Sequence, residues 1–212
     1  MGKDFTTLKT ALADWLGNLD TTELPDSIRG DCINIALREI CRLHDTRYNE
    51  VSDTFATLNN IFDYAVPATW SRPYTLWYIH PVNSGIVRLI FKSKDEFDQL
   101  FPDTTKTALP THYTVWGSNI RLGKTPDRAV TINRNFYAIL ADLSAANLTN
   151  GFTDNAWEPL LFNALAESSE FGIEDARIPM WRERGRKFVR DLVIEQARAK
   201  SMGRRATSTE PH

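Results

Sequence analysis

The stretch spanning residues 109–171 constrains the fold more than any other, because the spacing of its apolar residues changes once along it. In its first half, apolar and polar residues alternate in short runs separated by turns at Gly117-Ser118-Asn119 and Pro126-Asp127. Such alternation, with β-branched and aromatic residues, predicts short antiparallel strands. From Asn155 onward the apolar residues recur every three or four positions, which predicts a helix. A chain that combines both patterns is expected to be an α+β protein.

Helices are also predicted at both ends of the chain. Apolar spacing predicts one helix over residues 5–16 and a second over 25–44, and Pro179 is a favourable first residue for a third. In the second helix, Cys32 and Cys41 are nine residues apart and therefore point to opposite sides. We expect both to be small buried residues that form no disulfide with each other.

A β-rich insert is predicted between these helical regions. Apolar residues on both sides of Asn59-Asn60 indicate a hairpin, and two further extended segments are expected at 70–79 and 86–91. Ser93 and Glu96 have the spacing of a capping box, so a short helix should begin after Ser93.

Together these patterns predict an α+β fold in which a helical bundle is built from both chain ends. The bundle should comprise residues 1–50 and 137–200, and the β-rich insert, a hairpin or small sandwich, should comprise 51–136. Residues 201–212 are polar and are expected to form a flexible tail. No apolar run approaches the roughly 20 residues that span a bilayer, and no secretory signal is evident, so no membrane contact is expected.

No motif in the sequence predicts catalysis, a cofactor or a metal site. The segment from Gly117 to Thr125 resembles a phosphate-binding loop, but five residues separate its glycines where the motif requires four, and Pro126 interrupts the helix that should follow. The four histidines share no metal-ligand spacing. Glu167 and Glu170 lie on one predicted helix face, where a hydrolytic pair is an alternative to ordinary solvent-facing carboxylates.

The six tryptophans divide into two groups. Trp15, Trp157 and Trp181 fall on helical apolar stripes and are expected in a core. The other three lie in the β-rich part beside tyrosines, where burial or a protein interface is favoured over base stacking; they are Trp70, Trp77 and Trp116.

Charge is distributed unevenly along the chain. The net charge is −2, yet residues 173–212 contain ten Lys/Arg and six Asp/Glu, which leaves the remainder acidic. A basic C-terminal limb suggests contact with an acidic partner, and a solvated helix face is the simpler alternative. The physical chemistry also allows a DNA-binding helix, although no recognition helix with a preceding turn is evident.

Several of these patterns together resemble a known family. The relevant residues are Leu109-Pro110-x-x-Tyr113-x-Val115-x-Gly117-x-x-Ile120-x-Leu122, Pro126, Thr131-Ile132-x-x-x-Phe136-Tyr137 and Trp157-x-Pro159-Leu160-Leu161-x-x-Ala164-Leu165. In this order they resemble the head-to-tail adaptor (head-completion, or connector) proteins of tailed bacteriophages, including the tubular proteins of short-tailed phages. The two predicted N-terminal helices agree with the resemblance.

The resemblance implies a structural protein of the virion and not an enzyme. Such a protein would form a dodecameric ring that joins the portal ring to a tail nozzle or tube protein and continues the DNA channel used in genome packaging and ejection. DNA would pass through the lumen without sequence-specific binding. The protein would be made in the host cytoplasm and located at the portal–tail junction.

The resemblance also suggests which residues contact these partners. The terminal helix and tail would engage the portal through Trp181, Arg182, Arg184, Arg186, Phe188, Arg204 and Arg205. The β-rich insert would face the tail through Trp70, Tyr74 and Trp77. The alternative function is a nucleic-acid-binding accessory protein that uses the same basic C-terminal helix.

Overall fold

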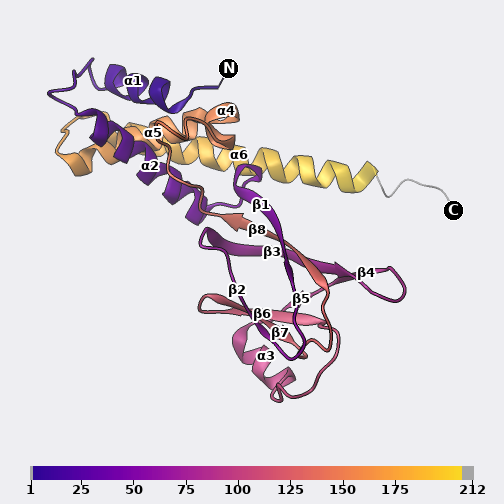
Figure 1. Ribbon diagram of the computed structural model, residues 1–212. Helices are drawn as coiled ribbons and strands as arrows, with labels where there is room; N and C mark the ends of the chain where they lie inside the picture. Colours follow the sequence, from indigo (N-terminus) through magenta and orange to yellow (C-terminus); the bar gives the residue numbers. More distant parts are fainter. Residues whose placement is uncertain (1, 207–212) are drawn as a thin grey trace. The chain divides into compact units, whose positions relative to one another are not determined.

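The computed structural model describes residues 2–206, with side chains as far as residue 199 (Figure 1). The chain divides into two compact units. The helical unit contains the residues up to Asn49 and those from Ile139 onward, and the sheet unit is Glu50–Ala138. The predicted α+β class, with helices from both chain ends, is confirmed.

Helices from both ends of the chain form the helical unit, and α5 lies at its centre. It packs against α1, α2 and α6, and seven of its eleven residues are buried. Side chains fix two of the helix starts: Asp4 accepts a hydrogen bond from the Thr7 amide at 2.7 Å, and Asn150 and Thr153 form a capping box. The elements are α1 (Phe5–Trp15), α2 (Asp26–Leu43), η1 (Arg47–Asn49), α4 (Gly151–Asn155), α5 (Trp157–Glu167), η2 (Ser168–Phe171) and α6 (Ile178–Ala206).

The first two helices agree with prediction to within one residue at each end. Helix α6 begins next to Pro179, as predicted, but it continues to Ala206, six residues into the segment expected to be a flexible tail. Residues 198–206 are mostly good helix formers, and the single Gly203 costs only about 1 kcal/mol in a helix. Polarity alone was therefore a poor guide to where the helix ends. The rest of the expected tail, residues 207–212, lies outside the described residues.

Two four-stranded sheets enclose the core of the sheet unit. One has the strand order β1-β8-β3-β4 and the other β2-β7-β6-β5. Leu76 and Ile132 of the first sheet share a core with Ile120 and Leu122 of the second. The elements are β1 (Glu50–Ala56), β2 (Asp63–Ala65), β3 (Trp70–Ile79), β4 (Ile86–Arg88), β5 (Ile90–Phe91), α3 (Lys94–Leu100), β6 (His112–Trp116), β7 (Asn119–Gly123) and β8 (Thr131–Ala138).

Local features of the sheet unit largely agree with prediction. Strands β6 and β7 form the expected hairpin around Gly117, whose φ of 58° lies in the left-handed region. Ser93 caps α3 by accepting a hydrogen bond from the Glu96 amide at 3.4 Å. The segment that resembles a phosphate-binding loop ends in β7 and continues into β8 without a helix.

The predicted hairpin around Asn59-Asn60 was wrong. Strand β1 pairs with β8 and strand β2 pairs with β7, so the intervening segment crosses from one sheet to the other. The Asn60 amide donates to the Pro126 carbonyl, which ties the crossing to a distant loop. The extended segment expected at 86–91 also divides between the sheets, because β4 joins the first and β5 the second. Apolar alternation indicates a strand but does not identify its partner.

Candidate interaction surface on the C-terminal helix

Three apolar residues anchor α6 to the rest of the helical unit. Trp181 is fully buried, Val189 is buried, and Phe188 stacks on Phe162 of α5 with ring centroids 5.5 Å apart. Trp181 was predicted both as a core residue and as a portal contact. Its burial confirms the first prediction and removes its ring from the surface that a partner would meet. The other two helical tryptophans are less buried than predicted: Trp157 is half-buried and Trp15 is 39% exposed.

Gly185 allows α6 to approach α5 closely. A Cβ atom at this position would lie 2.7 Å from the side-chain oxygen of Asn163. That amide is held in place because its nitrogen donates to the Pro159 carbonyl at 2.7 Å. The glycine therefore serves packing, and the exposed residues on both sides of it determine which surface α6 presents.

The predicted arginines of α6 lie on two different faces. Arg184 is exposed, with its guanidinium over the ring of Phe162 at 4.6 Å. Arg182 and Arg186 are one helical turn apart and both line a groove of about 340 Å³. The structure therefore brings Arg182 and Arg186 together and separates Arg184 from them.

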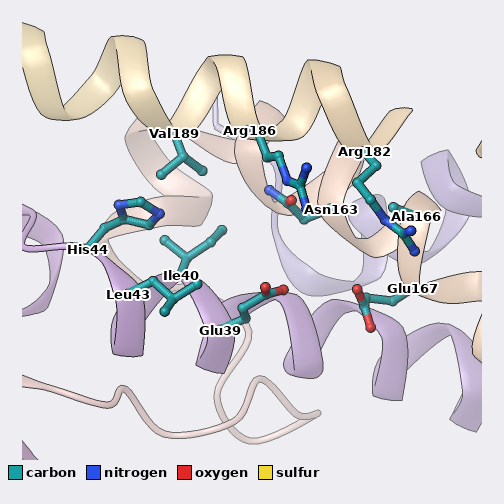
Figure 2. Close-up of a pocket in the computed structure, with 10 residues that line it drawn as sticks. All are labelled: Glu39, Ile40, Leu43, His44, Asn163, Ala166, Glu167, Arg182, Arg186 and Val189. Carbon is teal, nitrogen blue, oxygen red and sulfur yellow. The ribbon is translucent and has the colours of Figure 1, made fainter. Parts of the chain in front are cut away.

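This groove, which we call the α2–α6 groove, has charged and apolar walls (Figure 2). In Figure 2 the arginines of α6 lie across from Glu39 of α2 and Glu167 of α5. The apolar lining comes from Ile40, Leu43, Ala166 and Val189, and the remaining residues are His44 and Asn163. Leu43 is 61% exposed, so an apolar side chain of α2 is available at the surface.

Partial burial raises the pKa of Glu167, and the nearby carboxylate of Glu39 raises it further. The positive charge of Arg182 opposes this shift. The groove lining contains no serine, threonine or cysteine that could act as a nucleophile. Among the described residues, no group of three His, Cys, Asp or Glu side chains is placed to hold a metal ion. The arrangement is suited to holding a charged and apolar segment of another protein.

Sequence reasoning missed the part of the groove that α2 provides. Glu39 and Leu43 are four residues apart, which places them on one face of α2. That spacing is visible in the sequence, but the sequence does not reveal that α6 leaves this face partly uncovered.

The last two predicted portal contacts lie farther along α6. The backbones of Arg204 and Arg205 belong to the helix, and their side chains lie outside the described part of the chain. Eighteen residues separate Arg204 from Arg186, a rise of about 27 Å along the axis. They are therefore not part of the α2–α6 groove.

The three residues predicted to face the tail all lie in β3, on different faces of its sheet. Trp70 stacks on Phe136 with ring centroids 4.9 Å apart, on the inner face. Tyr74 is 45% exposed and packs on Tyr137, which follows Phe136 and so lies on the outer face. Trp77 is half-buried and, because both its neighbours are buried in the core, it also points outward.

Trp70 has a structural role in the sheet unit. The Arg134 guanidinium lies 5.9 Å from the centre of the Trp70 ring and also contacts the rings of Phe55 and Phe136. It donates two hydrogen bonds of 2.6 Å to the carboxylate of Asp53. Tyr74 and Trp77 are therefore the two predicted residues on the outer face, and Trp116 of β6 is 60% exposed elsewhere on the unit.

A sequence model described as SU10 adaptor protein matches residues 3–208, nearly the whole chain. No curated protein matches the sequence. No helix in the described part of the chain is long and apolar enough to cross a membrane.

Proposed function

The chain belongs to the SU10 adaptor protein family, and from this premise we propose that it forms a ring between the portal and the tail of a bacteriophage virion. The family is one of phage head-to-tail adaptors and is structural, not catalytic. The predicted family resemblance is thereby confirmed. The proposed ring contains twelve subunits and continues the channel through which the genome is packaged and ejected.

The arrangement of α6 is the observation that carries this proposal. The helix has 29 residues and is therefore about 43 Å long. Its buried residues among those described are Trp181, Gly185, Val189 and Gln196, which form a single stripe. The arginines beside this stripe are exposed on a firmly packed helix, so they can meet a partner at little entropic cost.

We assign portal docking to α6 through Arg182, Arg184 and Arg186, and Phe188 supports Arg184, whose guanidinium lies 5.8 Å from the centre of the Phe188 ring. Arg204 and Arg205 extend the same basic helix towards its C-terminus. Tyr74 and Trp77, on the outer face of β3, are assigned to the tail nozzle or tube protein. Because ring contacts between identical subunits are heterologous, separate patches of one subunit must be complementary.

The proposal is tested by measuring mass and shape with and without the cognate portal protein, by light scattering and negative-stain electron microscopy. We expect rings of this chain on the portal. A chain truncated after Met202 should bind the portal more weakly, because it loses Arg204 and Arg205. Absence of any association between the full chain and the portal would contradict the adaptor function.

Charge reversal tests whether the exposed arginines of α6 dock the portal. Changing Arg182, Arg184 and Arg186 to glutamate should abolish portal binding while the far-ultraviolet circular dichroism spectrum stays unchanged. Reversal of Arg128, which is exposed in the sheet unit and paired with Asp127, is the matched control. Equal binding by the triple variant and the wild type would show that α6 is not the docking element.

The exposed basic residues of α6 also support the second candidate, a nucleic-acid-binding accessory protein. Lys187 and Arg190 add to the exposed arginines on this helix. Binding of this kind would shift duplex DNA at micromolar protein and would weaken steeply with added salt. Lack of a salt-sensitive shift would leave the adaptor function as the better account of the basic helix.

A further inference from the structure

The α2–α6 groove has opposite charges on its two sides, and these charges do not touch. Arg182 and Arg186 of α6 form what we call the basic wall, and Glu39 of α2 and Glu167 of α5 form the acidic wall (Figure 2). Within the described part of the chain, none of these four side chains forms a hydrogen bond or a salt bridge. The N–H donors of both guanidinium groups and the oxygens of both carboxylates are therefore available to a partner.

The basic wall does not neutralise the acidic wall of the same chain. The pKa of Glu167 is raised, first by burial and then by the carboxylate of Glu39. The effect of Glu39 exceeds the opposing effect of Arg182, so the carboxyl of Glu167 is influenced more by its acidic neighbour than by its basic one. A further cation placed at the acidic wall by a partner would stabilise both carboxylates.

Two other cations of α2 lie outside the groove. Arg38 pairs with Asp142 at 3.1 Å. Each residue turns a helix by about 100°, so Arg42 and Leu43 lie on opposite sides of Glu39. Leu43 lines the groove and Arg42 does not. The side of α2 that faces the groove is therefore acidic and apolar.

The two walls make the groove complementary to a second copy of itself. A two-fold axis along the groove turns the second copy so that its basic wall faces the acidic wall of the first, and the reverse. The rotation leaves each residue at its own level along the axis. In Figure 2 Arg186 lies across from Glu39 and Arg182 lies across from Glu167. Glu39 of one copy would therefore meet Arg186 of the other, and Glu167 would meet Arg182.

Apolar surface on the same face supports this pairing. Leu43, at the rim of the groove, is 61% exposed, and Ile40 and Val189 are buried beneath it. Figure 2 places Leu43 and Val189 at the same end of the groove, so the same rotation brings Leu43 of one copy over Val189 of the other. Removal of an exposed leucine from water favours association, and the charged walls determine which surfaces face each other.

We propose that, in the absence of the portal, two copies of this chain pair through their α2–α6 grooves in a two-fold symmetric dimer. The biological role of the dimer rests on the proposed function, because the pairing covers Arg182 and Arg186, two of the arginines assigned to portal docking. Arg184 lies over Phe162 on another face of α6 and stays uncovered. The dimer thus keeps the docking surface occupied until the portal displaces the second copy.

The first experiment is sedimentation velocity of the full chain without the portal, over a series of protein concentrations. We expect a reversible dimer whose dissociation constant increases with added salt. Leu43→Asp should raise that constant on the order of tenfold or more, because it places a carboxylate in the apolar part of the contact. Leu58→Asp is the matched control, since Leu58 is 59% exposed in the sheet unit, and it should dimerise as the wild type does.

Exchange of charge between the walls tests the two-fold arrangement directly. A variant with Arg182→Glu and Arg186→Glu has two acidic walls, and a variant with Glu39→Arg and Glu167→Arg has two basic walls. Each variant alone should be monomeric at concentrations at which the wild type is dimeric. An equimolar mixture of the two should form a heterodimer, provided that circular dichroism shows both to be folded.

The outcomes separate the dimer from the proposed function. A wild-type chain that is monomeric at every concentration, Leu43→Asp that dimerises as tightly as the wild type, or folded charge variants that stay monomeric when mixed would overturn the pairing. If such a monomer still forms rings on the portal, and loses them when both groove arginines are reversed, the groove binds the portal alone. A wild-type dimer that never associates with the portal would contradict the adaptor function and leave the pairing intact.

Discussion

In the helical unit, α5 meets its neighbours through buried apolar side chains, whereas in the sheet unit each of the outer strands β1 and β2 is joined to its neighbour by an arginine–aspartate pair. Asp53 lies opposite Arg134 in the β1–β8 register, and Asp63 lies opposite Arg121 in the β2–β7 register. Each arginine donates two hydrogen bonds to its aspartate. Both units have an apolar core, and the sheet unit adds charged pairs at fixed register that join its outer strands to their neighbours.

The comparison teaches where each unit is most sensitive to substitution. In the helical unit, the loss of free energy of unfolding should increase with the volume that a substitution removes from the core or adds to it. In the sheet unit, removal of one member of a charged pair should cost more free energy of unfolding when the charge that remains is more deeply buried. Arg134 is 7% exposed at the side chain, while Arg121 is 29% exposed, so the two pairs of the sheet unit should differ from each other as well.

The largest effect is expected for Trp181→Ala in the helical unit. Removal of this fully buried ring leaves a cavity beneath α6 and should lower the free energy of unfolding by about 3–5 kcal/mol. Urea denaturation followed by circular dichroism at a helix-sensitive wavelength measures the change. Met180→Ala, one residue earlier and 52% exposed, is the control. If Trp181→Ala loses no more free energy of unfolding than Met180→Ala, packing of the Trp181 ring does not hold α6 in place.

The next largest effect is expected for Asp53→Ala in the sheet unit. It leaves the buried guanidinium of Arg134 unpaired and should cost about 3 kcal/mol. Asp63→Ala is the matched comparison, because its partner Arg121 retains access to water, and the expected cost is about 1 kcal/mol. Hydrogen exchange of the β1 and β2 amides reports each strand separately. Equal losses of unfolding free energy in the two variants would show that burial of the arginine does not determine the cost of removing its aspartate.

A smaller effect is expected for Gly185→Val, which adds volume between α5 and α6 where Trp181→Ala removes it. The new side chain would collide with Asn163 and should cost about 1–3 kcal/mol. Adding Asn163→Ala should restore part of the stability, so a double-mutant cycle by urea denaturation would give a coupling between the two sites. Strictly additive losses would argue against a direct contact between α5 and α6 at this point.

The smallest effect concerns pH and the carboxyl of Glu167. Its pKa is raised from 4.5 by partial burial, so the native state binds its proton more tightly than the unfolded chain does. Stability from this group is therefore present at low pH and falls as pH rises above about 4.5 through the raised folded-state pKa. Glu167→Gln should remove that decline, and the urea midpoints of variant and wild type should diverge as pH rises. Glu170→Gln serves as the exposed comparison. Urea midpoints of Glu167→Gln and wild type that diverge as pH falls would show that the pKa of Glu167 is lowered in the native state.

The helices could be predicted well from the sequence, and the sheet pairing could not. Apolar spacing indicates where α1 and α2 begin, and the cap at Ser93 indicates where α3 begins, so these signals are local in the sequence. The crossing between β1 and β2 depends instead on β7 and β8, more than 50 residues away. Alternation in the sequence contains no information about such partners, which is why the hairpin at Asn59-Asn60 was predicted wrongly.

The candidate surface was predictable only in part, for a similar reason. The basic character of α6 is visible from composition, and the exposed Arg182, Arg184 and Arg186 agree with it. The burial of Trp181 and the contribution of Glu39 to the groove are set by how α5 and α2 pack on α6. Helical periodicity identifies residues that share a face, but tertiary packing decides which face remains open.

The two ends of the sheet unit are neighbours, because Glu50 at the start of β1 is paired with Tyr137 near the end of β8. A module whose entry and exit lie side by side can be excised as one cassette and replaced by another of different size, with a short bridge left in its place. Evolution can therefore exchange this module without rebuilding the helices that flank it. The same property makes residues 50–138 a natural site for grafting a foreign domain.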